Sequence, residues 1–320
     1  MKLNHEFIKL PFKFDSAQLI EEIQKFEETE WIPHPDKFKG NFSIPLLTVN
    51  GTINNAFNGA IKPTPALLNS PYLSQTIASF GEVFGRSRLM RLDPASEVPL
   101  HTDTSYHWMK RVRIHIPIVT DEDVIFYCGD KSVHMKAGEA WIFDAWKYHK
   151  VENNGKTNRV HLVIDTAGSS KFWQMVEESE KYCVSENWDE LTCNNINYEA
   201  GKSVNILTEQ YNSPLVMHPG EIRGLIYEVL DELSLVSSNS QSSINFVKKS
   251  LNMFAYEWQR LWSIFGENKQ GWEFFNQLRQ QVFNNIAAQK FDLKISNGSS
   301  LTDMLIYCVL QPSINVELAQ

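Results

Sequence analysis

Three residues of this chain could together hold a metal ion: His101, Asp103 and His149. His101 and Asp103 stand two positions apart, and on an extended segment such residues project to the same side. Two imidazoles and one carboxylate cover one face of an octahedral Fe(II) ion and leave three positions for a bidentate cosubstrate and O2. The His-x-Asp motif alone is short enough to occur by chance, so its neighbourhood must decide between an iron site and ordinary loop residues.

Two nearby segments, 111–116 and 159–164, alternate apolar residues with basic ones. Because successive strand side chains point to opposite faces, each segment has one apolar face and one basic face. On an exposed sheet the basic faces would be solvated, whereas inside a small barrel they would form a donor-rich pocket suited to a dicarboxylate. Because the His/Asp/His set is also present, we favour the pocket over a solvated face. The residues on the basic faces are Arg111, Arg113, His115, Arg159 and His161.

The elements that must position these residues are short strands, which the sequence predicts between about 31 and 167. Pro, Gly and Asn separate the runs, and regular short strands with turn signals between them favour a barrel or a sandwich. A helix is predicted before them, over about 15–30, with Asp15 or Ser16 as its cap. The predicted strands are 44–49, 87–92, 111–116, 124–127, 139–143 and 159–164.

After residue 169 the pattern becomes helical, apart from an irregular Asn-rich stretch at 193–212. Apolar residues recur at helical spacing behind Pro219, which suits the first turn of a helix. We therefore expect an α+β protein with two domains, a β-rich domain over 1–170 and an all-helical domain over 171–320. The predicted helices are 172–182, one opening at Pro219, 244–265, 272–288 and 301–309.

The composition narrows the class of protein. The 320 residues carry a formal net charge of −8, and this acidic balance argues against a nucleic-acid partner. The four cysteines form no CxxC pair, and this argues against a disulfide framework and against a thiolate zinc site. There is no apolar run long enough to span a membrane and no apolar stretch typical of a signal peptide. These features predict a cytoplasmic protein without a membrane partner.

The sequence resembles the aspartyl/asparaginyl β-hydroxylase family of Fe(II)/2-oxoglutarate-dependent dioxygenases, which includes bacterial free-proline hydroxylases. The resemblance covers about residues 30–170, and Arg159 follows His149 by ten positions. The helical remainder lies outside it. The matching segments are His101-Thr-Asp103, Arg113-Ile-His115-Ile-Pro117, residues 137–144, His149-Lys-Val-Glu-Asn153 and Arg159-Val-His-Leu-Val-Ile-Asp165, preceded by residues 88–94.

The resemblance implies a double-stranded β-helix, the jelly-roll fold shared with cupins. It implies that His101, Asp103 and His149 ligate iron, that Arg159 holds the distal carboxylate of 2-oxoglutarate, and that Arg113 and His115 line the same pocket. Because a carboxylate ligand leaves no vacant position for chloride, hydroxylation is favoured over halogenation. The reaction would use O2, release succinate and CO2, and place a hydroxyl group on the substrate, with the metal and cosubstrate supplying the hard chemistry.

The substrate-binding residues are harder to predict. Arg88 and Arg91 stand three apart on one predicted strand, so they cannot share a face. We favour Arg88 as the residue that holds a substrate carboxylate, because related free-proline hydroxylases use an Arg at the corresponding place. A surface ion pair or simple packing remains the alternative for each candidate. The further candidates are His34, Tyr106, Trp108 and Trp146.

The leading hypothesis is therefore a hydroxylase of an amino acid that is free, within a small peptide or carrier-bound. A second is the same chemistry on Asp or Asn side chains of a protein or ribosomal peptide, with the helical domain as a docking platform. A third, of another class, is a cupin-like metal-binding sensor or interaction module whose helical domain mediates oligomerisation as a homodimer. A zinc hydrolase is a fourth, but it leaves Arg159, Arg113 and His115 without a role.

Overall fold

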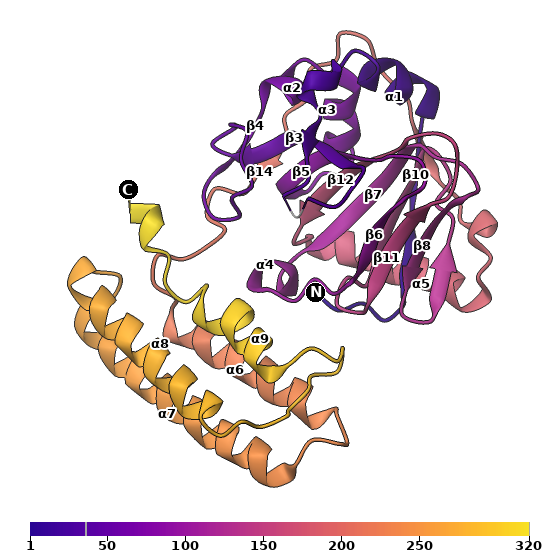
Figure 1. Ribbon diagram of the computed structural model, residues 1–320. Coiled ribbons are helices and arrows are strands. Elements are labelled where there is room, and N and C mark those ends of the chain that lie inside the picture. Colours follow the sequence, from indigo (N-terminus) through magenta and orange to yellow (C-terminus); the bar gives the residue numbers. More distant parts are fainter. Residues whose placement is uncertain (36, 320) are drawn as a thin grey trace. The chain divides into compact units, whose positions relative to one another are not determined.

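The computed structural model describes residues 1–35 and 37–319, which form two compact units (Figure 1). The β-rich unit consists of residues 1–103 and 110–212. The helical unit consists of residues 104–109 and the chain from 213 onward. Each unit is described by itself below.

The β-rich unit contains a large main sheet, in which the neighbouring strands follow the order β13-β1-β10-β7-β12-β5-β3-β2, with β4 paired to β3 and β14 to β5. Most of its pairs are antiparallel. The strand bounds are β1 (Phe7–Phe14), β2 (Ile32–Pro33), β3 (Asn41–Val49), β4 (Ile61–Pro63), β5 (Val83–Leu92), β7 (Val112–Val119), β10 (Glu139–Phe143), β12 (Arg159–Thr166), β13 (Asn194–Ile196) and β14 (Leu207–Thr208).

A second sheet of four strands has the order β6-β11-β8-β9. From β5 onward the chain alternates between the sheets: β5, β7, β10 and β12 lie in the main sheet, and β6, β8, β9 and β11 in the second. This interleaving is the double-stranded β-helix, so the predicted fold class is confirmed. The second-sheet bounds are β6 (Ser96–His101), β8 (Val124–Cys128), β9 (Lys131–Val133) and β11 (His149–Asn153).

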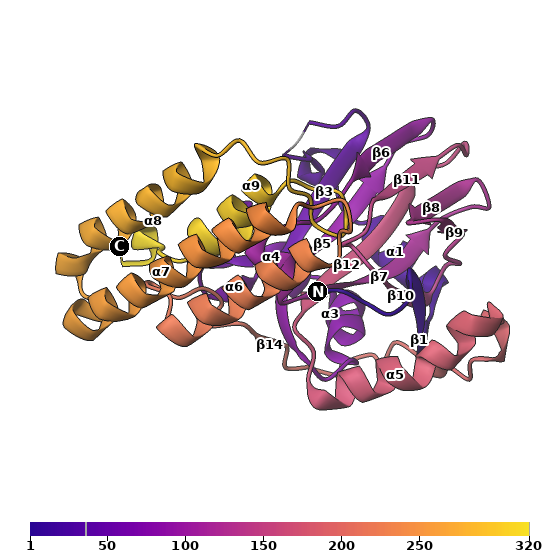
Figure 2. The ribbon, with the colours of Figure 1, turned by 90° about the horizontal axis from the view of Figure 1, so that it is seen from below.

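Helices cover the outer face of the main sheet (Figure 2). The alternation of β7 and β12 sends Ile114, Ile116, Leu162 and Ile164 into this outer core, where they pack with apolar side chains of the helices. Asp15 caps the first helix by accepting a hydrogen bond from the backbone N–H of residue 18. The helices are α1 (Ser16–Ile23), α2 (Pro65–Leu68), α3 (Pro71–Ala78) and α5 (Ser170–Ser185).

A smaller apolar cluster lies between the two sheets. Phe126 of β8 and Trp141 and Phe143 of β10 belong to it, together with Leu92 at the end of β5. The remaining space on this inner side of the main sheet is taken by charged and polar side chains, which form the site described below.

The helical unit is built from α6 (Pro219–Ser234), α7 (Gln241–Phe265) and α8 (Trp272–Ala287), with α4 (Tyr106–Met109), α9 (Leu301–Met304) and the π-helical η4 (Leu305–Leu310). Trp258 of α7 is fully buried and donates its indole N–H to the carbonyl of Met217 at 2.8 Å. Its ring packs against Phe275 of α8. Within residues 1–35 and 37–319, no helix has both the length and the apolar character needed to cross a membrane.

The division between the units differs from the predicted boundary at 170/171. Helix α5 belongs to the β-rich unit, because Phe172, Val176 and Cys183 pack into the outer core. The stretch to residue 212 stays with the same unit, because β13 pairs with β1 and β14 with β5. Residues 104–109, by contrast, belong to the helical unit. Gln320, the last residue of the predicted helical domain, lies outside the described residues.

The first predicted helix is also shorter than expected. It ends at Ile23, and a separate 3-10 turn, η1 (Glu28–Glu30), follows it. Glu27 and Glu30 form a reciprocal capping box that starts this new turn, so the chain changes direction where the apolar pattern alone predicts a continuous helix.

Candidate metal centre

His101, Asp103 and His149 lie together at one end of the second sheet. His149 opens β11 and stands opposite His101, the last residue of β6. The backbone N–H of Asp103 donates to the carbonyl of Ala145 at 2.9 Å, which holds the loop after β6 beside the turn before β11. Strand pairing therefore brings together three residues that are separated by 48 positions in the chain.

The ligand atoms of the three residues are within reach of one ion, since all lie within 4.8 Å of one another. Asp103 Oδ1 is 4.0 Å from His101 Nε2, and Oδ2 is 3.9 Å from His149 Nε2. Two metal–ligand bonds of about 2.1 Å span at most about 4.2 Å. A divalent cation therefore fits between these groups with small shifts of the side chains.

Both imidazoles are oriented for metal binding. His101 Nδ1 lies 2.7 Å from the carbonyl of Pro99, and His149 Nδ1 lies 2.9 Å from that of Lys147. A carbonyl oxygen only accepts, so each Nδ1 carries the proton and each Nε2 presents its lone pair. Burial of His149 lowers the pKa of its imidazole, which favours the neutral form that binds metals. Backbone carbonyls thus fix the tautomer, as outer partners do in metal sites.

A row of rings leads from the metal cluster along the inner side of the main sheet. The ring of Phe143 lies 4.9 Å from that of His149 and 5.1 Å from that of His115. Beyond it, His161 stacks on Phe126 at 5.3 Å. The guanidinium of Arg159 lies 4.9 Å from the centre of the same Phe126 ring.

Three polar side chains in this row are buried without hydrogen-bond partners. Both ring nitrogens of His115 and of His161, and Nε of Arg159, lack a partner within the described residues. Burial lowers the pKa of Arg159 to about 9 and those of both histidines well below their usual 6.5. At neutral pH the arginine is therefore charged and the imidazoles are neutral. Buried unpaired groups are costly, and their clustering indicates a site for an anionic ligand.

The two arginines that the sequence analysis contrasted lie on opposite faces of β5. Arg91 faces outward, where it donates to both carboxylate oxygens of Glu28 at 2.7 and 2.6 Å and lies over the ring of Trp31. Arg88 lies opposite Val163 of β12, and His115 of β7 stands on the other side of the same Val163. Arg88 thus belongs to the inner face, where it is buried and its Nε has no hydrogen-bond partner among the described residues.

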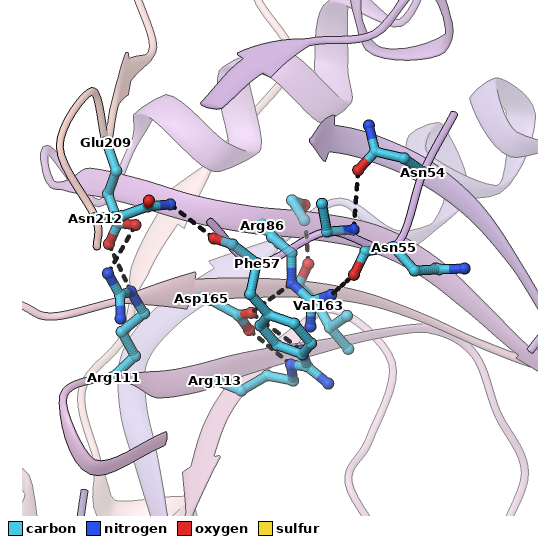
Figure 3. A network of polar contacts seen from close by, with 12 residues as sticks. Asn54, Asn55, Phe57, Arg86, Arg111, Arg113, Val163, Asp165, Glu209 and Asn212 are labelled. Atoms are coloured by element: carbon cyan, nitrogen blue, oxygen red, sulfur yellow. Dashed lines mark hydrogen bonds and ion pairs between the residues drawn. The ribbon is translucent and has the colours of Figure 1, made fainter. Parts of the chain in front are cut away.

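Arg113, predicted to line the cosubstrate pocket, forms a two-point ion pair with Asp165, its opposite residue on β12. Its Nε and Nη2 donate to the two carboxylate oxygens at 2.7 and 3.1 Å (Figure 3). The same network contains Arg86, a buried inner-face residue that sequence reasoning missed. The predicted strand began at residue 87, although Arg86 has the same parity as Arg88, and that parity was the available signal.

The remaining predicted substrate residues are dispersed. His34 stacks on Phe38 at the β2 edge of the main sheet. Trp146 is buried in the turn before His149, with Lys2 over its ring. Tyr106 and Trp108 belong to α4 of the helical unit, where Tyr106 donates its hydroxyl to Glu221 of α6 at 2.7 Å.

The fold and the His/Asp/His cluster define a cupin-like metal-binding class of protein. Residues 17–168 match the family model for Aspartyl/Asparaginyl beta-hydroxylase. The match runs from α1 to the end of β12, so this part of the chain is similar to that family.

Two curated relatives are similar to this chain. It is 26% identical over 177 residues to L-proline cis-4-hydroxylase of Rhizobium meliloti (strain 1021), an alignment that covers 52% of this chain and 63% of the relative. It is 28% identical over 150 residues to L-proline cis-3-hydroxylase 1 of a Streptomyces species, with 43% and 51% covered. The chain therefore spans between half and two thirds of the length of these relatives.

Among solved structures, an oxidoreductase of the 2OG-Fe(II) oxygenase family from Burkholderia pseudomallei has a TM-score of 0.36 to this structure. It is 13% identical, and the match covers 51% of this chain and 85% of that one.

Proposed function

We propose that this protein is an Fe(II)/2-oxoglutarate-dependent dioxygenase that hydroxylates an amino acid, either free, in a small peptide or carrier-bound, with release of succinate and CO2. The observation that carries the proposal is that the candidate metal ligands and the buried donors adjoin one another. Three candidate metal ligands and three buried donors without partners among the described residues lie on either side of the Phe143 ring, which neighbours His149 at 4.9 Å and His115 at 5.1 Å.

The donor set fits the metal. His101 and His149 would bind iron through Nε2, and Asp103 through its carboxylate, because both Nδ1 protons are already donated to backbone carbonyls. Two imidazoles and one carboxylate are the ligands of non-haem Fe(II) oxygenases. When bound together, iron, 2-oxoglutarate and O2 supply the oxidation that converts a C–H bond of the substrate to C–OH.

The unpartnered donors fit the cosubstrate. The Arg159 guanidinium would bind the distal carboxylate of 2-oxoglutarate, since burial away from any carboxylate leaves its charge uncompensated. His115 and His161 each carry one N–H, because the neutral form is favoured, and can donate to the same ligand. His161 was left undecided by sequence reasoning, and its contact with Phe126, which Arg159 shares, supports a place in this pocket.

Arg88 is the candidate for binding the substrate. It is buried on the same face as His115, two strands away across β12, and its guanidinium makes no ion pair among residues 1–35 and 37–319. We assign it to a carboxylate of the amino acid. The similarity to two L-proline hydroxylases supports an amino acid as the kind of substrate.

Two finer expectations remain proposals. One is that the protein works in the cytoplasm. The other is a homodimer through the helical unit, which exposes the large side chains of Tyr227, Met253, Tyr256 and Ile264 on α6 and α7. Light scattering of the purified protein tests the second, because a monomer at micromolar concentration would exclude it.

The test is consumption of 2-oxoglutarate by the purified protein with Fe(II), ascorbate and a panel of amino acids. We expect succinate formation that depends on one of the amino acids and is lost in His149→Ala. The matched control is His5→Ala, which removes a half-buried histidine before β1 and should leave turnover unchanged. Failure of the wild-type protein to bind metal and 2-oxoglutarate would refute the proposal.

A further inference from the structure

The six arginines of the β-rich unit fall into two groups, according to whether a carboxylate accepts hydrogen bonds from the guanidinium. Three donate to both oxygens of a carboxylate at 2.6 to 3.1 Å: Arg91 to Glu28, Arg111 to Glu209 and Arg113 to Asp165. The other three, Arg86, Arg88 and Arg159, are equally buried but have no carboxylate oxygen within hydrogen-bond distance in the described part of the chain.

An arginine keeps its charge when buried. Among the described residues, Arg88 and Arg159 form no ion pair, and Arg86 has only a long one, at 3.9 Å, to the Asp165 carboxylate that it shares with Arg113. Each of the three can therefore take an anionic ligand. The proposed function supplies one, because the distal carboxylate of 2-oxoglutarate pairs with Arg159. An amino acid with a single carboxylate supplies a second, to Arg88. Arg86 is then left as a buried positive charge that neither molecule neutralises.

The contacts of Arg86 are weak for a buried cation. Its Nη1 donates to the backbone carbonyl of Asn55 at 3.3 Å, and its guanidinium carbon lies 3.5 Å from the centre of the Phe57 ring (Figure 3). Its Nε has no hydrogen-bond partner, and the nearest oxygen of Asp165 is 3.9 Å away. That carboxylate already accepts two hydrogen bonds from Arg113. Neutral partners hold Arg86 in place but leave its charge available.

The segment that covers Arg86 is itself anchored. Asn212 accepts from the backbone N–H of Gly59 at 2.8 Å and donates to the carbonyl of Phe57 at 2.9 Å. Asn54 donates to the carbonyl of Val49 at 2.8 Å and accepts from the N–H of Ala56. These bonds fix the Phe57 ring over the guanidinium, so Arg86 is ordered before any ligand binds, which reduces the entropy cost of recognition.

Arg86 and Arg88 are spaced for two anionic groups of one molecule. They stand two residues apart on β5 and share its inner face, which separates their Cα atoms by roughly 6.5 Å. Burial lowers the pKa of Arg86 to about 9 and of Arg88 to about 10. The charge of Arg113 lowers both further, and the charge of Arg88 also lowers the pKa of Arg86. The Asp103 carboxylate acts in the opposite sense on Arg86, so the pair lies within electrostatic reach of the metal cluster.

We propose that Arg86, held by Asn55 and Phe57, forms with Arg88 a two-point site for a substrate that carries two carboxylates, namely an acidic amino acid. Arg88 takes the α-carboxylate and Arg86 the side-chain carboxylate. The proposal rests on the proposed function and specifies its substrate class.

The test is calorimetric titration of the Mn(II)-loaded, 2-oxoglutarate-saturated protein without O2, so that binding is measured in place of turnover. The ligands are L-aspartate and L-glutamate, the neutral matched amides L-asparagine and L-glutamine, and L-proline. We expect one of the diacids to bind about 10- to 100-fold more tightly than its amide, the range typical of one charge-assisted hydrogen-bonded pair.

Arg86→Met should abolish that preference while leaving the affinity for the amide unchanged, and Arg88→Met should weaken both ligands. Arg86→Lys keeps a positive charge and should retain part of the preference, which separates recognition from misfolding. Arg91→Met, on the outer face, is the matched control. The proposal is overturned if neither diacid is preferred by the wild type, or if Arg86→Met weakens amide and diacid equally.

The proposed function and the proposed substrate class can be refuted separately. If 2-oxoglutarate itself does not bind the Mn(II)-loaded wild type, the proposed function is lost. If it binds, and the amino acids show no preference for a second carboxylate, only the substrate class is lost.

Discussion

The two faces of strands β5, β7 and β12 differ in chemistry and in what they contact. The outer face is apolar and packs against α1, α3 and α5, with Ile114 and Leu162 fully buried. The inner face, one residue away at every position, carries the buried guanidinium and imidazole groups of Arg88, Arg159, His115 and His161. Each of these has a nitrogen without a hydrogen-bond partner among residues 1–35 and 37–319. A period of two residues therefore assigns one side of a strand to folding and the other to ligand binding.

The two faces also contribute to the free energy of folding in opposite directions. The outer face stabilises the fold through apolar burial. The inner face costs stability, since desolvated charges and unpaired imidazoles are tolerated only where a ligand completes them. Substitutions on the two faces should therefore have opposite consequences, and the four below are ordered from the largest expected effect to the smallest.

His149→Ala, at the candidate metal site on the second sheet, should produce the largest effect. We expect the variant to lose Fe(II) binding and succinate formation, because two remaining ligands hold the metal poorly. Its secondary structure should be unchanged, because His149 lies at the start of β11 and outside the apolar cores. Metal content and circular dichroism measure the two parts, and a folded variant that keeps full metal content would contradict the assignment.

Leu162→Ala should have the opposite signature. Removing a fully buried side chain from the outer core should lower the free energy of unfolding by about 2–5 kcal/mol. Below its melting transition the variant should bind 2-oxoglutarate as the wild type does. Denaturant unfolding and ligand titration of the same sample check this. A large loss of 2-oxoglutarate affinity in the folded variant would mean that the two faces are not independent.

Arg159→Met should weaken 2-oxoglutarate binding by about 2 kcal/mol or more, roughly 30-fold, because a buried carboxylate would lose its charged partner. The melting temperature of the ligand-free protein should stay the same or rise, since an uncompensated buried charge is replaced by an apolar chain of similar length. Arg91→Met is the control on the outer face. Equal 2-oxoglutarate affinities for Arg159→Met and Arg91→Met would refute the assignment of ligand binding to the inner face.

The smallest effect is the pH dependence of stability in the metal-free protein. The folded-state pKa of His161 lies well below 6.5, because burial and the charge of Arg159 disfavour its protonation. The unfolded state therefore binds the extra proton first, and stability falls as the pH drops below about 6.5, by up to about 2 kcal/mol at pH 5 for one such group. His161→Phe should lose less stability than the wild type between pH 6.5 and 5. Parallel losses in urea titrations would argue against a buried neutral imidazole.

The sequence predicts those parts of the site that depend on alternation. It separated Arg88 from Arg91, and the structure places them on opposite faces of β5. It placed Arg113 and His115 on one face, but it did not indicate that Asp165 of β12 would pair with Arg113, because the register between two strands is a tertiary property. The same register brings His161 and His115 together.

Other features lay beyond a local pattern. Arg86 was missed because the predicted strand began at residue 87, whereas β5 begins at Val83. The segment that covers Arg86, 51–60, is held in part by tertiary hydrogen bonds of Asn212. Tyr106 and Trp108 follow Asp103 closely in the chain, and their proximity in sequence suggested aromatic walls. The packing of α4 in the helical unit and the bond from Tyr106 to Glu221 depend on residues more than 100 positions away.

The central claim is that the inner face binds 2-oxoglutarate against a metal ion. The most direct test is an anaerobic titration of the Fe(II)-loaded protein with 2-oxoglutarate, followed by the metal-to-ligand charge-transfer absorbance. The account predicts saturation at one 2-oxoglutarate per chain, no such absorbance in His149→Ala, and a weakened response in Arg159→Met with Arg91→Met unchanged. Absence of binding in the wild type, or binding that survives both His149→Ala and Arg159→Met, would contradict it.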